Sequence, residues 1–244
     1  MKYANCNSKL YEAVIKRGFN LQYVVEVGVW HPESSNIYRF IEDGLKTALV
    51  EPDPKSIELI KAKWGDYKNV RLYEVAIADF EGEIQLCQKG SSTFASSLTN
   101  SPALANDNCN IQELEKFMAR SVKFSSIDDG NIDLISIDTE GSEWFVIKDM
   151  VSRPTIISIE THGELYINPY INQLKEWLDN QNYTLWFKDK SDSIYVLKDE
   201  IYLTFSDKMH LLFTDILLVT RRARKRAIKN LKKFLRSIRK SKNS

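Results

Sequence analysis

Residues that could bind or act on a ligand follow the apolar, strand-like segments of this sequence. They are Glu26 and Gly28, Glu51 and Asp53, Ala78 and Asp79, Asp138 and Glu140, and Glu160 and His162. A single acid after a strand often only caps the next helix, and Asp53, which precedes Pro54, fits that interpretation. Five such strand ends, alternating with helical segments, are harder to explain in this way. Because the carboxyl ends of parallel strands meet at one edge of a sheet, they predict a shared binding site.

The densest acidic group is Asp138, Glu140 and Glu143 in the stretch IDTEGSE. Oxygen ligands of this kind could hold a divalent cation. Acids at positions i and i+2 around a strand end do not reliably face one point, however, so a metal ion is not favoured and no metal ligand is assigned. His162 has a neutral form at physiological pH and suits the role of a general base, although a lone histidine after a strand is more often structural.

Glu51 indicates what the site could bind. It lies 25 residues after Glu26, close to the spacing at which a Rossmann-type domain places an acid on ribose hydroxyls. The stretch EVGVWHPESS has one glycine where a dinucleotide fingerprint needs three, so close approach of the backbone to a pyrophosphate is not expected. A nucleoside without phosphates fits better than NAD or FAD.

The elements that must position these residues alternate between strand and helix. Apolar, β-branched runs such as QYVVEVGV, TALVEPDP and TIISIETH are separated by helical patterns such as KSIELIKAKWG and NPYINQLKEWLDNQNY. This order predicts an α/β fold with a mainly parallel, doubly wound sheet covered on both faces. Residues 184–222, including DILLV, are predicted to be rich in strand and to add an antiparallel strand at one edge. Residues 90–110 are predicted to form a long loop.

The net charge of +1 hides an asymmetry along the chain. Residues 221–244 hold twelve of the 34 Lys and Arg residues and none of the 33 Asp and Glu residues, which leaves a net charge of −11 on residues 1–220. On a helical wheel the apolar residues of this segment share one arc of about 140°, opposite most of the cations. They are Ala223, Ala227, Ile228, Leu231, Phe234, Leu235 and Ile238.

Such a segment is typical of a basic amphipathic helix that lies on an anionic membrane surface. RNA binding and a merely solvated helix are the alternatives. Nucleic acid is not favoured, because the segment lacks the stacking aromatics of a nucleic-acid strip and has only Phe234. No signal peptide or apolar window of about 18 residues is evident, so we expect a cytoplasmic protein that is peripheral at the inner face of the membrane.

Six motifs follow one another in order along the chain. They are VVEVGVWHPESSNIY, LVEPDP, VAIADFEGE, SSTFASSL, SIDDGNIDLISIDTEGSEWFVIKDM and IISIETH. In these motifs, over about residues 20–188, the sequence resembles the FkbM family of S-adenosylmethionine-dependent methyltransferases. The resemblance implies a Rossmann-like class I methyltransferase fold. We expect this domain over residues 1–220, with the basic amphipathic tail over residues 221–244.

The resemblance also implies roles for individual residues. Glu26 and Gly28 would lie against the methionine part of S-adenosylmethionine, Glu51 would hold the ribose, and Ala78 and Asp79 would lie near the adenine. Asp138 would face the reactive end of the cofactor, and Glu140, Gly141 and Glu143 would complete the family signature. His162 would lie near the acceptor. The chain departs from the family pattern at Pro32, which replaces a second glycine and stiffens that loop.

The resulting expectation is an O-methyltransferase that acts on a hydroxyl, that of a sugar in a glycan or lipid-linked saccharide. Asp138, Glu140 and His162 are the candidate catalytic residues, because a free hydroxyl is a poor nucleophile and its proton must be removed. Ser91, Ser92 and Thr93 could bond acceptor hydroxyls. The alternatives are a non-catalytic, membrane-associated binding module on the same fold and another nucleotide-binding enzyme, an oxidoreductase or a sugar-modifying enzyme.

Overall fold

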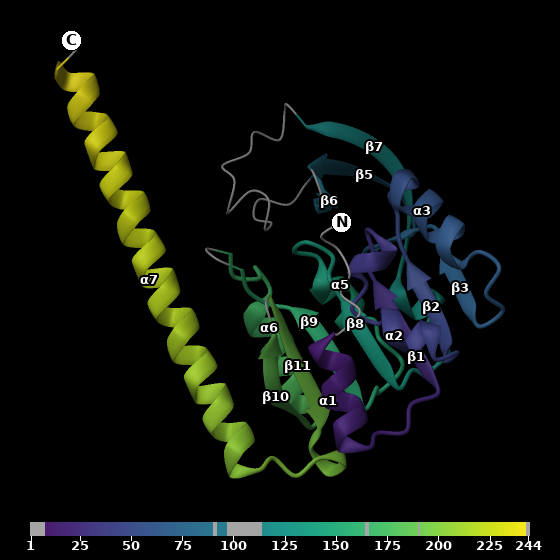
Figure 1. The fold of residues 1–244 in the computed structure, drawn as a ribbon. Helices are drawn as coiled ribbons and strands as arrows, with labels where there is room; N and C mark the ends of the chain where they lie inside the picture. Colours follow the sequence, from purple (N-terminus) through teal and green to yellow (C-terminus); the bar gives the residue numbers. More distant parts are fainter. Residues whose placement is uncertain (1–7, 90–91, 97–113, 164–165, 190, 243–244) are drawn as a thin grey trace.

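The computed structural model describes residues 8–89, 92–96, 114–163, 166–189 and 191–242, with side chains described up to residue 230. Its main feature is a mixed sheet of strand order β10-β11-β9-β8-β1-β2-β3 (Figure 1). The strands are β1 Tyr23–Val27, β2 Lys46–Val50, β3 Val70–Tyr73, β8 Leu134–Ile137, β9 Ile156–Glu160, β10 Tyr183–Asp189 and β11 Asp192–Leu197. Strands β9, β8, β1, β2 and β3 run parallel, while β11 is antiparallel to both β9 and β10. The predicted α/β class, parallel centre and antiparallel edge are confirmed.

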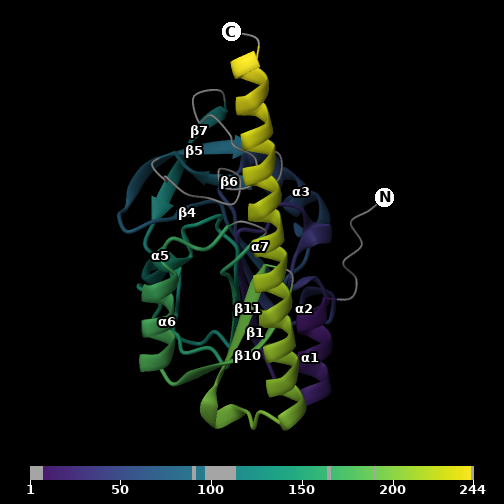
Figure 2. The ribbon, with the colours of Figure 1, turned by 90° about the vertical axis from the view of Figure 1, so that its left-hand side faces the viewer.

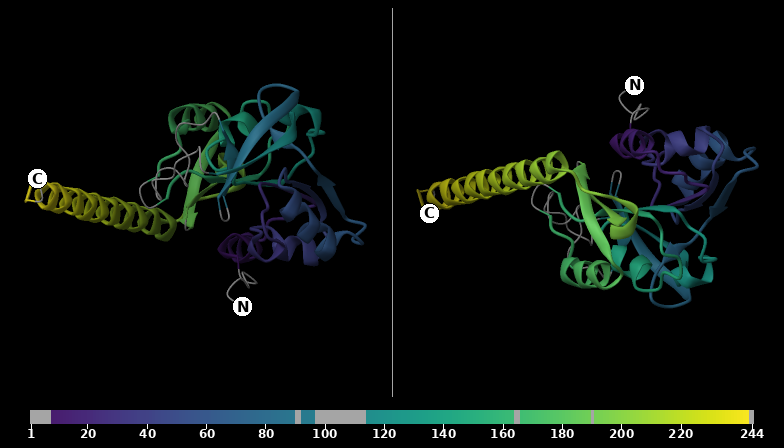
Figure 3. Two further views of the ribbon diagram at one scale, coloured as in Figure 1. Left: turned by 90° about the horizontal axis from the view of Figure 1, so that it is seen from above. Right: turned by 90° about the horizontal axis from the view of Figure 1, so that it is seen from below.

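Helices cover both faces of this sheet. They are α1 Lys9–Arg17, α2 Tyr38–Glu42, α3 Pro54–Trp64, α5 Glu143–Ile147 and α6 Ile171–Asn180, with short 3-10 turns at Pro32–Ser34, Phe124–Ser126 and Lys198–Glu200. Side chains alternate between the two faces of a strand, so Val24 packs with α1, α2 and α3, whereas Val25 packs with α5 and α6. Figure 3 shows α1 (purple) and α6 (green) on opposite sides of the sheet. Strands buried on both faces explain the continuous apolar runs of the sequence.

A smaller sheet lies beside the carboxyl ends of the main strands, in the order β4-β7-β5-β6. Its strands are β4 Ala76–Ile77, β5 Gly82–Lys89, β6 Ser92–Ala95 and β7 Glu115–Val122. The prediction of an uninterrupted loop over residues 90–110 is therefore wrong at β6, which pairs with β5. Residues 97–113 of that predicted loop lie outside the described residues. Pairing of β5 with the distant β7 is a long-range contact that local sequence patterns do not reveal.

The C-terminal segment differs most from the prediction. The stretch DILLV, predicted as a strand, lies within helix α7, Phe205–Lys242, whose 38 residues run past residue 220 without a break. Its apolar side chains Leu212, Phe213, Ile216 and Leu217 recur at helical spacing, which outweighs the β-propensity of Ile216 and Val219. At the N-terminal end, Asp207 accepts hydrogen bonds from Thr204 and pairs with Arg17 of α1. Figure 2 shows the other end projecting beyond the rest of the molecule.

The division of the chain at residue 220 stays a prediction. No helix in the described part of the chain combines the length and apolar character needed to cross a membrane.

Candidate functional site

The floor of the site is the turn after β1, where Gly28 lets two strand ends approach each other. Gly28 has a φ of +83°, and a β-carbon added to it would lie 1.8 Å from the carbonyl oxygen of Asp138. Its amide donates to the carbonyl of Val50 (2.9 Å), while the amide of Asp138 donates to Val27 (2.9 Å). These bonds tie together the ends of β1, β2 and β8, and only glycine fits at the centre.

Glu51, at the end of β2, organises the loop that follows. One of its oxygens, Oε2, accepts the amides of Val29 and Trp30 (both 2.9 Å), and the other, Oε1, accepts the amide of Asp53 (2.9 Å). Trp30 has a φ of +54°, so this pair of bonds holds it in a conformation that costs a non-glycine residue energy. Burial raises the pKa of Glu51, and the backbone donors oppose that shift.

Glu26 lies on β1 in the same cavity. Its carboxylate accepts the hydroxyl of Ser35 (2.5 Å) and the amide of Asn36 (2.8 Å). Burial, with smaller contributions from Asp138 and Glu51, raises the pKa of Glu26 to about 8. The side-chain amide of Asn36 in turn donates to Ser136 and to Asp192 (3.2 and 3.3 Å), which links the 3-10 turn region to β8 and β11.

The IDTEGSE stretch forms the turn from β8 into α5. Glu140 and Gly141 have φ values of +55° and +111°, and Glu143 stabilises this turn by accepting the amides of Thr139 and Gly141 (2.9 and 3.1 Å). The other oxygen of Glu143 accepts the side-chain amide of Asn168. Glu143 therefore clamps the turn, whereas Asp138 and Glu140 lie at the cavity wall.

Glu140 accepts a hydrogen bond from the smaller sheet, on the opposite side of the site. The hydroxyl of Ser92, on β6 of the smaller sheet, donates to its Oε1 (2.7 Å), while its buried Oε2 has no hydrogen-bond partner among the described residues. Burial, followed by the charge of Asp138, raises the pKa of Glu140 to about 8. Burial and then the charge of Glu143 raise the pKa of Asp138 to about 7. Both carboxyls can therefore exchange a proton near neutral pH.

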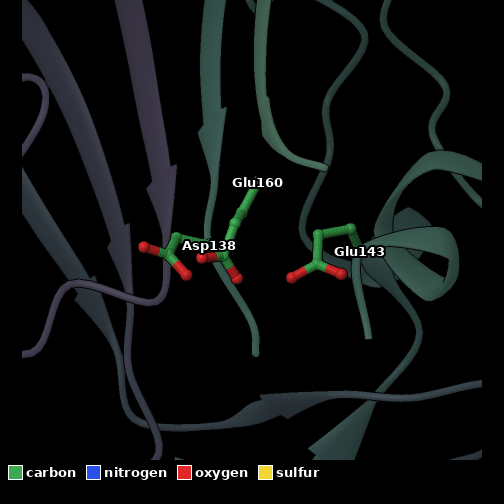
Figure 4. Close-up of side chains that lie close together, drawn as sticks. All are labelled: Asp138, Glu143 and Glu160. Carbon is green, nitrogen blue, oxygen red and sulfur yellow. The ribbon is translucent and has the colours of Figure 1, made fainter. Parts of the chain in front are cut away.

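Strand register explains why Glu160 lies beside Asp138. Ile137 of β8 pairs with Ile159 of β9, so the next residues, Asp138 and Glu160, stand at neighbouring strand ends. Asp192 of β11 pairs with Glu160 on its other side. Figure 4 shows the carboxyl groups of Asp138 and Glu160 together, with that of Glu143 pointing toward them from α5. Ligand oxygens of Asp138, Glu143 and Glu160 lie within 4.8 Å of one another.

These strand ends and the smaller sheet enclose a cavity of about 290 Å³. Its carboxylates belong to Glu26, Glu51, Asp138, Glu140 and Asp192; no Lys, Arg or His is among the described residues that line it. Its apolar wall includes Ile77, Ile84, Leu86 and Phe94. An acidic cavity with an apolar wall suits a cationic ligand that carries an aromatic ring and hydroxyls, and it disfavours a pyrophosphate because of charge repulsion.

Not every residue predicted for the site lines this cavity. Glu26, Gly28, Glu51, Asp138 and Glu140 do. Ala78 is buried nearby without lining it, and the carboxylate of Asp79, half-exposed, pairs with Lys148 (3.7 Å). His162 is also outside the lining; it is buried, with its Nδ1 2.9 Å from the hydroxyl of Thr161.

The sequence prediction missed several residues of the site. Ile84, Leu86 and Phe94 come from the smaller sheet, Asn36 comes from the turn before α2, and Asp192 begins β11. The alternation of apolar and polar residues in EIQLCQ was the available signal for the wall, but it does not reveal which surface the strand faces.

Comparison with known protein families gives a match over most of the chain. The profile of the methyltransferase FkbM domain matches residues 20–185. Comparison with curated proteins gave no match.

Solved structures of methyltransferases are also among the matches, at low sequence identity. The methyltransferase domain of bacterial CtHen1 is 8% identical, with a TM-score of 0.44 and coverage of 77% of this chain and 94% of that one. The precorrin-6y C5,15-methyltransferase of Geobacter metallireducens is 13% identical, with a TM-score of 0.38 and coverage of 80% and 88%. The ribosomal protein L11 methylase of Lactobacillus delbrueckii is 10% identical, with a TM-score of 0.40 and coverage of 78% and 76%.

Proposed function

The chain belongs to the FkbM family of S-adenosylmethionine-dependent methyltransferases, and from this premise we propose that it methylates a hydroxyl oxygen of a sugar in a glycan or lipid-linked saccharide. When bound, S-adenosylmethionine supplies an activated methyl group on a positively charged sulfur. The acidic lining of the cavity is the observation that carries the proposal. Carboxyl groups of Glu26, Asp138 and Asp192 line the cavity, and a bound sulfonium or ammonium group would favour their charged forms.

Glu51 is the proposed partner of the ribose. Its Oε2 accepts two backbone amides, but Oε1 accepts only that of Asp53 among the described residues, so it retains room for a hydroxyl donor. The wall formed by Ile77 and Leu86 offers the apolar surface that an adenine ring requires. The residues present therefore fit the cofactor of the family.

Glu140 is the proposed general base. The efficiency of a base is greatest when its pKa lies near the working pH, and the pKa of Glu140 is raised into that range. Glu140 lines the cavity, and its Oε2, which has no hydrogen-bond partner in the described structure, is the oxygen proposed to receive the proton of an acceptor hydroxyl. Asp138 is also proposed as catalytic, and its carboxyl would share the negative charge that Glu140 carries when it has no proton. His162, the third residue proposed as catalytic, lies outside the cavity lining.

A sugar acceptor is supported by the polar groups around these acids. Thr93, Ser34 and Ser191 line the cavity along with Asn36, and together they offer hydrogen bonds to several hydroxyls. Ser92, which bonds Glu140, belongs to the serine-rich segment proposed to contact the acceptor; Ser91 lies outside the described residues.

Calorimetry tests this proposal against its alternatives. We expect saturable binding of S-adenosylhomocysteine and no heat from NAD. Binding of NAD instead would favour a nucleotide-dependent oxidoreductase, and absence of both would reject the cofactor assignment. Mass spectrometry of a cell extract incubated with the protein and labelled S-adenosylmethionine should then reveal a methylated saccharide. Cofactor binding without any labelled product would favour the non-catalytic binding module.

We further propose that α7 places the protein on an anionic membrane surface at the cytoplasmic face. The helix has the cations of residues 221–244 at its distal end, and its proximal half exposes Leu212, Phe213, Leu217 and Val219. Cations and apolar side chains on one helix support binding in the interfacial plane of a bilayer. RNA is the alternative partner, and competition by RNA for vesicle binding would identify it.

A further inference from the structure

We propose that the carboxylates of Asp138, Glu143 and Glu160 bind a divalent cation of the Mg²⁺, Mn²⁺ or Ca²⁺ type. The three residues come from the end of β8, the start of α5 and the end of β9. Two ligands of one such cation lie up to about 4–5 Å apart, since each bond is about 2.0–2.6 Å long. The separation of their ligand oxygens, at most 4.8 Å, is compatible with this limit. Carboxylates without histidine or cysteine select hard cations over zinc or copper.

This set differs from the one that the sequence suggested. Asp138, Glu140 and Glu143 share one turn, but Glu140 is directed to Ser92 of the smaller sheet. Glu160 takes its place, because the parallel register of β8 and β9 puts it next to Asp138.

The charge of the cluster is not balanced by protein cations. No Lys or Arg of the described chain forms an ion pair with Asp138, Glu143 or Glu160. Glu143 is fully buried and Glu160 is 7% exposed. Buried carboxylates in contact must either hold protons or be neutralised by a bound cation.

Two buried oxygens near the cluster point to a ligand independently of this charge. Oε2 of Glu160 has no hydrogen-bond partner among the described residues, and neither has the hydroxyl of Tyr166, a residue with 0% exposure. Burial, followed by the negative charges of Glu143 and Glu160, raises the pKa of Tyr166. A cation with its coordinated water would supply a partner for both oxygens.

Glu143 can contribute although it also clamps the turn. Its Oε1 accepts the amides of Thr139 and Gly141, whereas its Oε2 accepts the amide of Asn168 and keeps a second lone pair. Asn168 thereby orients a ligand, as hydrogen-bonded neighbours of metal-binding carboxylates commonly do. The use of the cation in catalysis rests on the proposed function: a hydroxyl bound to it would release its proton to Glu140 more readily.

The test is a titration of the full chain with Mn²⁺, in which the electron paramagnetic resonance signal measures the concentration of the free ion. We expect one bound ion per chain, displaced by Mg²⁺ or Ca²⁺, and affinity at least tenfold weaker in Glu160→Gln. Glu26→Gln is the matched control: it makes the same neutral change at another buried glutamate of the sheet, outside the cluster, and should alter affinity by less than about threefold. Lack of binding at millimolar Mn²⁺, or equal losses in the two variants, would overturn the proposal.

Thermal unfolding gives a second readout that guards against misfolded variants. At a cation concentration one hundred times Kd, Tm of the unmodified chain should rise by about 5–10 °C. In EDTA, Glu160→Gln should unfold no lower than the unmodified chain, because it relieves repulsion, and it should show no rise with the cation. If S-adenosylhomocysteine binds in EDTA and the titration finds no Mn²⁺ site, the cation proposal alone is rejected. If Mn²⁺ binds but the cofactor does not, the proposed function alone is rejected.

Discussion

The carbonyl oxygen of Asp138 occupies the space beside Gly28 where any other residue would place its β-carbon. This contact joins the turn after β1 to the end of β8, so it couples backbone packing to the geometry of the acidic cavity. A change at Gly28 must displace one of these two strand ends.

Gly28→Ala should lower the free energy of unfolding by about 4 kcal/mol or more, because it adds a backbone clash to the strain of a positive φ. Gly18→Ala is the matched control: Gly18 has a φ of +73° but no atom within 4 Å of an added β-carbon. It should cost only about 1–2 kcal/mol. Urea unfolding of both variants measures the difference, and equal costs would show that the Asp138 contact yields easily.

Glu51→Gln should weaken binding of S-adenosylhomocysteine by about 10- to 100-fold, since a hydrogen bond to a charged acceptor contributes about 1.5–3 kcal/mol. The loss includes disorder of the Trp30 loop, because glutamine cannot accept all the amides that Glu51 accepts. Calorimetry measures the affinity, with Glu58→Gln on the exposed side of α3 as control. Unchanged affinity would mean that another group holds the ribose.

Stability should fall as pH rises from about 5 to 8 when EDTA is present. The carboxyl of Glu26 has an ordinary pKa of 4.5, and burial raises it to about 8 in the folded chain. In this window the folded state holds a proton that the unfolded state has released, so each such group lowers the free energy of unfolding by at most about 1.4 kcal/mol per pH unit. Urea unfolding at several pH values gives the slope, which Glu26→Gln should reduce. A flat profile in the unmodified chain would contradict the expectation.

Ser92→Ala should shift the lower limb of the pH profile of kcat to higher pH. The hydroxyl of Ser92 stabilises the charged form of Glu140 and so opposes the rise of its pKa. Its removal should leave Glu140 protonated over a wider range, which disables it as a base. The comparison is with Ser96→Ala, the residue that directly follows the same strand. Identical profiles for both variants would exclude Glu140 as the base.

Membrane binding should depend on the cations at residues 221–226. Replacing these five residues with Gln should reduce flotation with anionic vesicles by at least tenfold, because each cation near the surface contributes about 1 kcal/mol. Replacing the five lysines of residues 46–68 makes an equal charge change on the body and should have little effect. Binding that is the same for both variants, or equal on zwitterionic vesicles, would reject the membrane proposal.

The central sheet and much of the site could be predicted because their signals are local. Each buried strand is a short apolar run, and parallel strands end at one edge, which brings Glu26, Glu51 and Asp138 together without any knowledge of loops. The smaller sheet could not be predicted in the same way, because β5 pairs with β7, which is distant in the sequence, and no local sequence pattern indicates that pairing.

The remaining errors have specific physical causes. The stretch DILLV contains the β-branched residues Ile216 and Val219, yet the helical spacing of Leu212, Phe213 and Ile216 runs into it. The pairing of Asp138 with Glu160 rather than Glu140 follows from strand register, which a single sequence does not reveal. Asp79 lies outside the cavity, where its carboxylate forms an ion pair with Lys148, 69 residues later in the sequence.

The alignment of β8, β9 and β11 also limits how this protein can change during evolution. Asp138, Glu160 and Asp192 lie side by side only because three strands share one register. A single-residue insertion within β9 would turn Glu160 to the opposite face, whereas exchanging one carboxylate for another would keep the cavity acidic. Length variation in the family should therefore be excluded from these strands and concentrated in the connections between them.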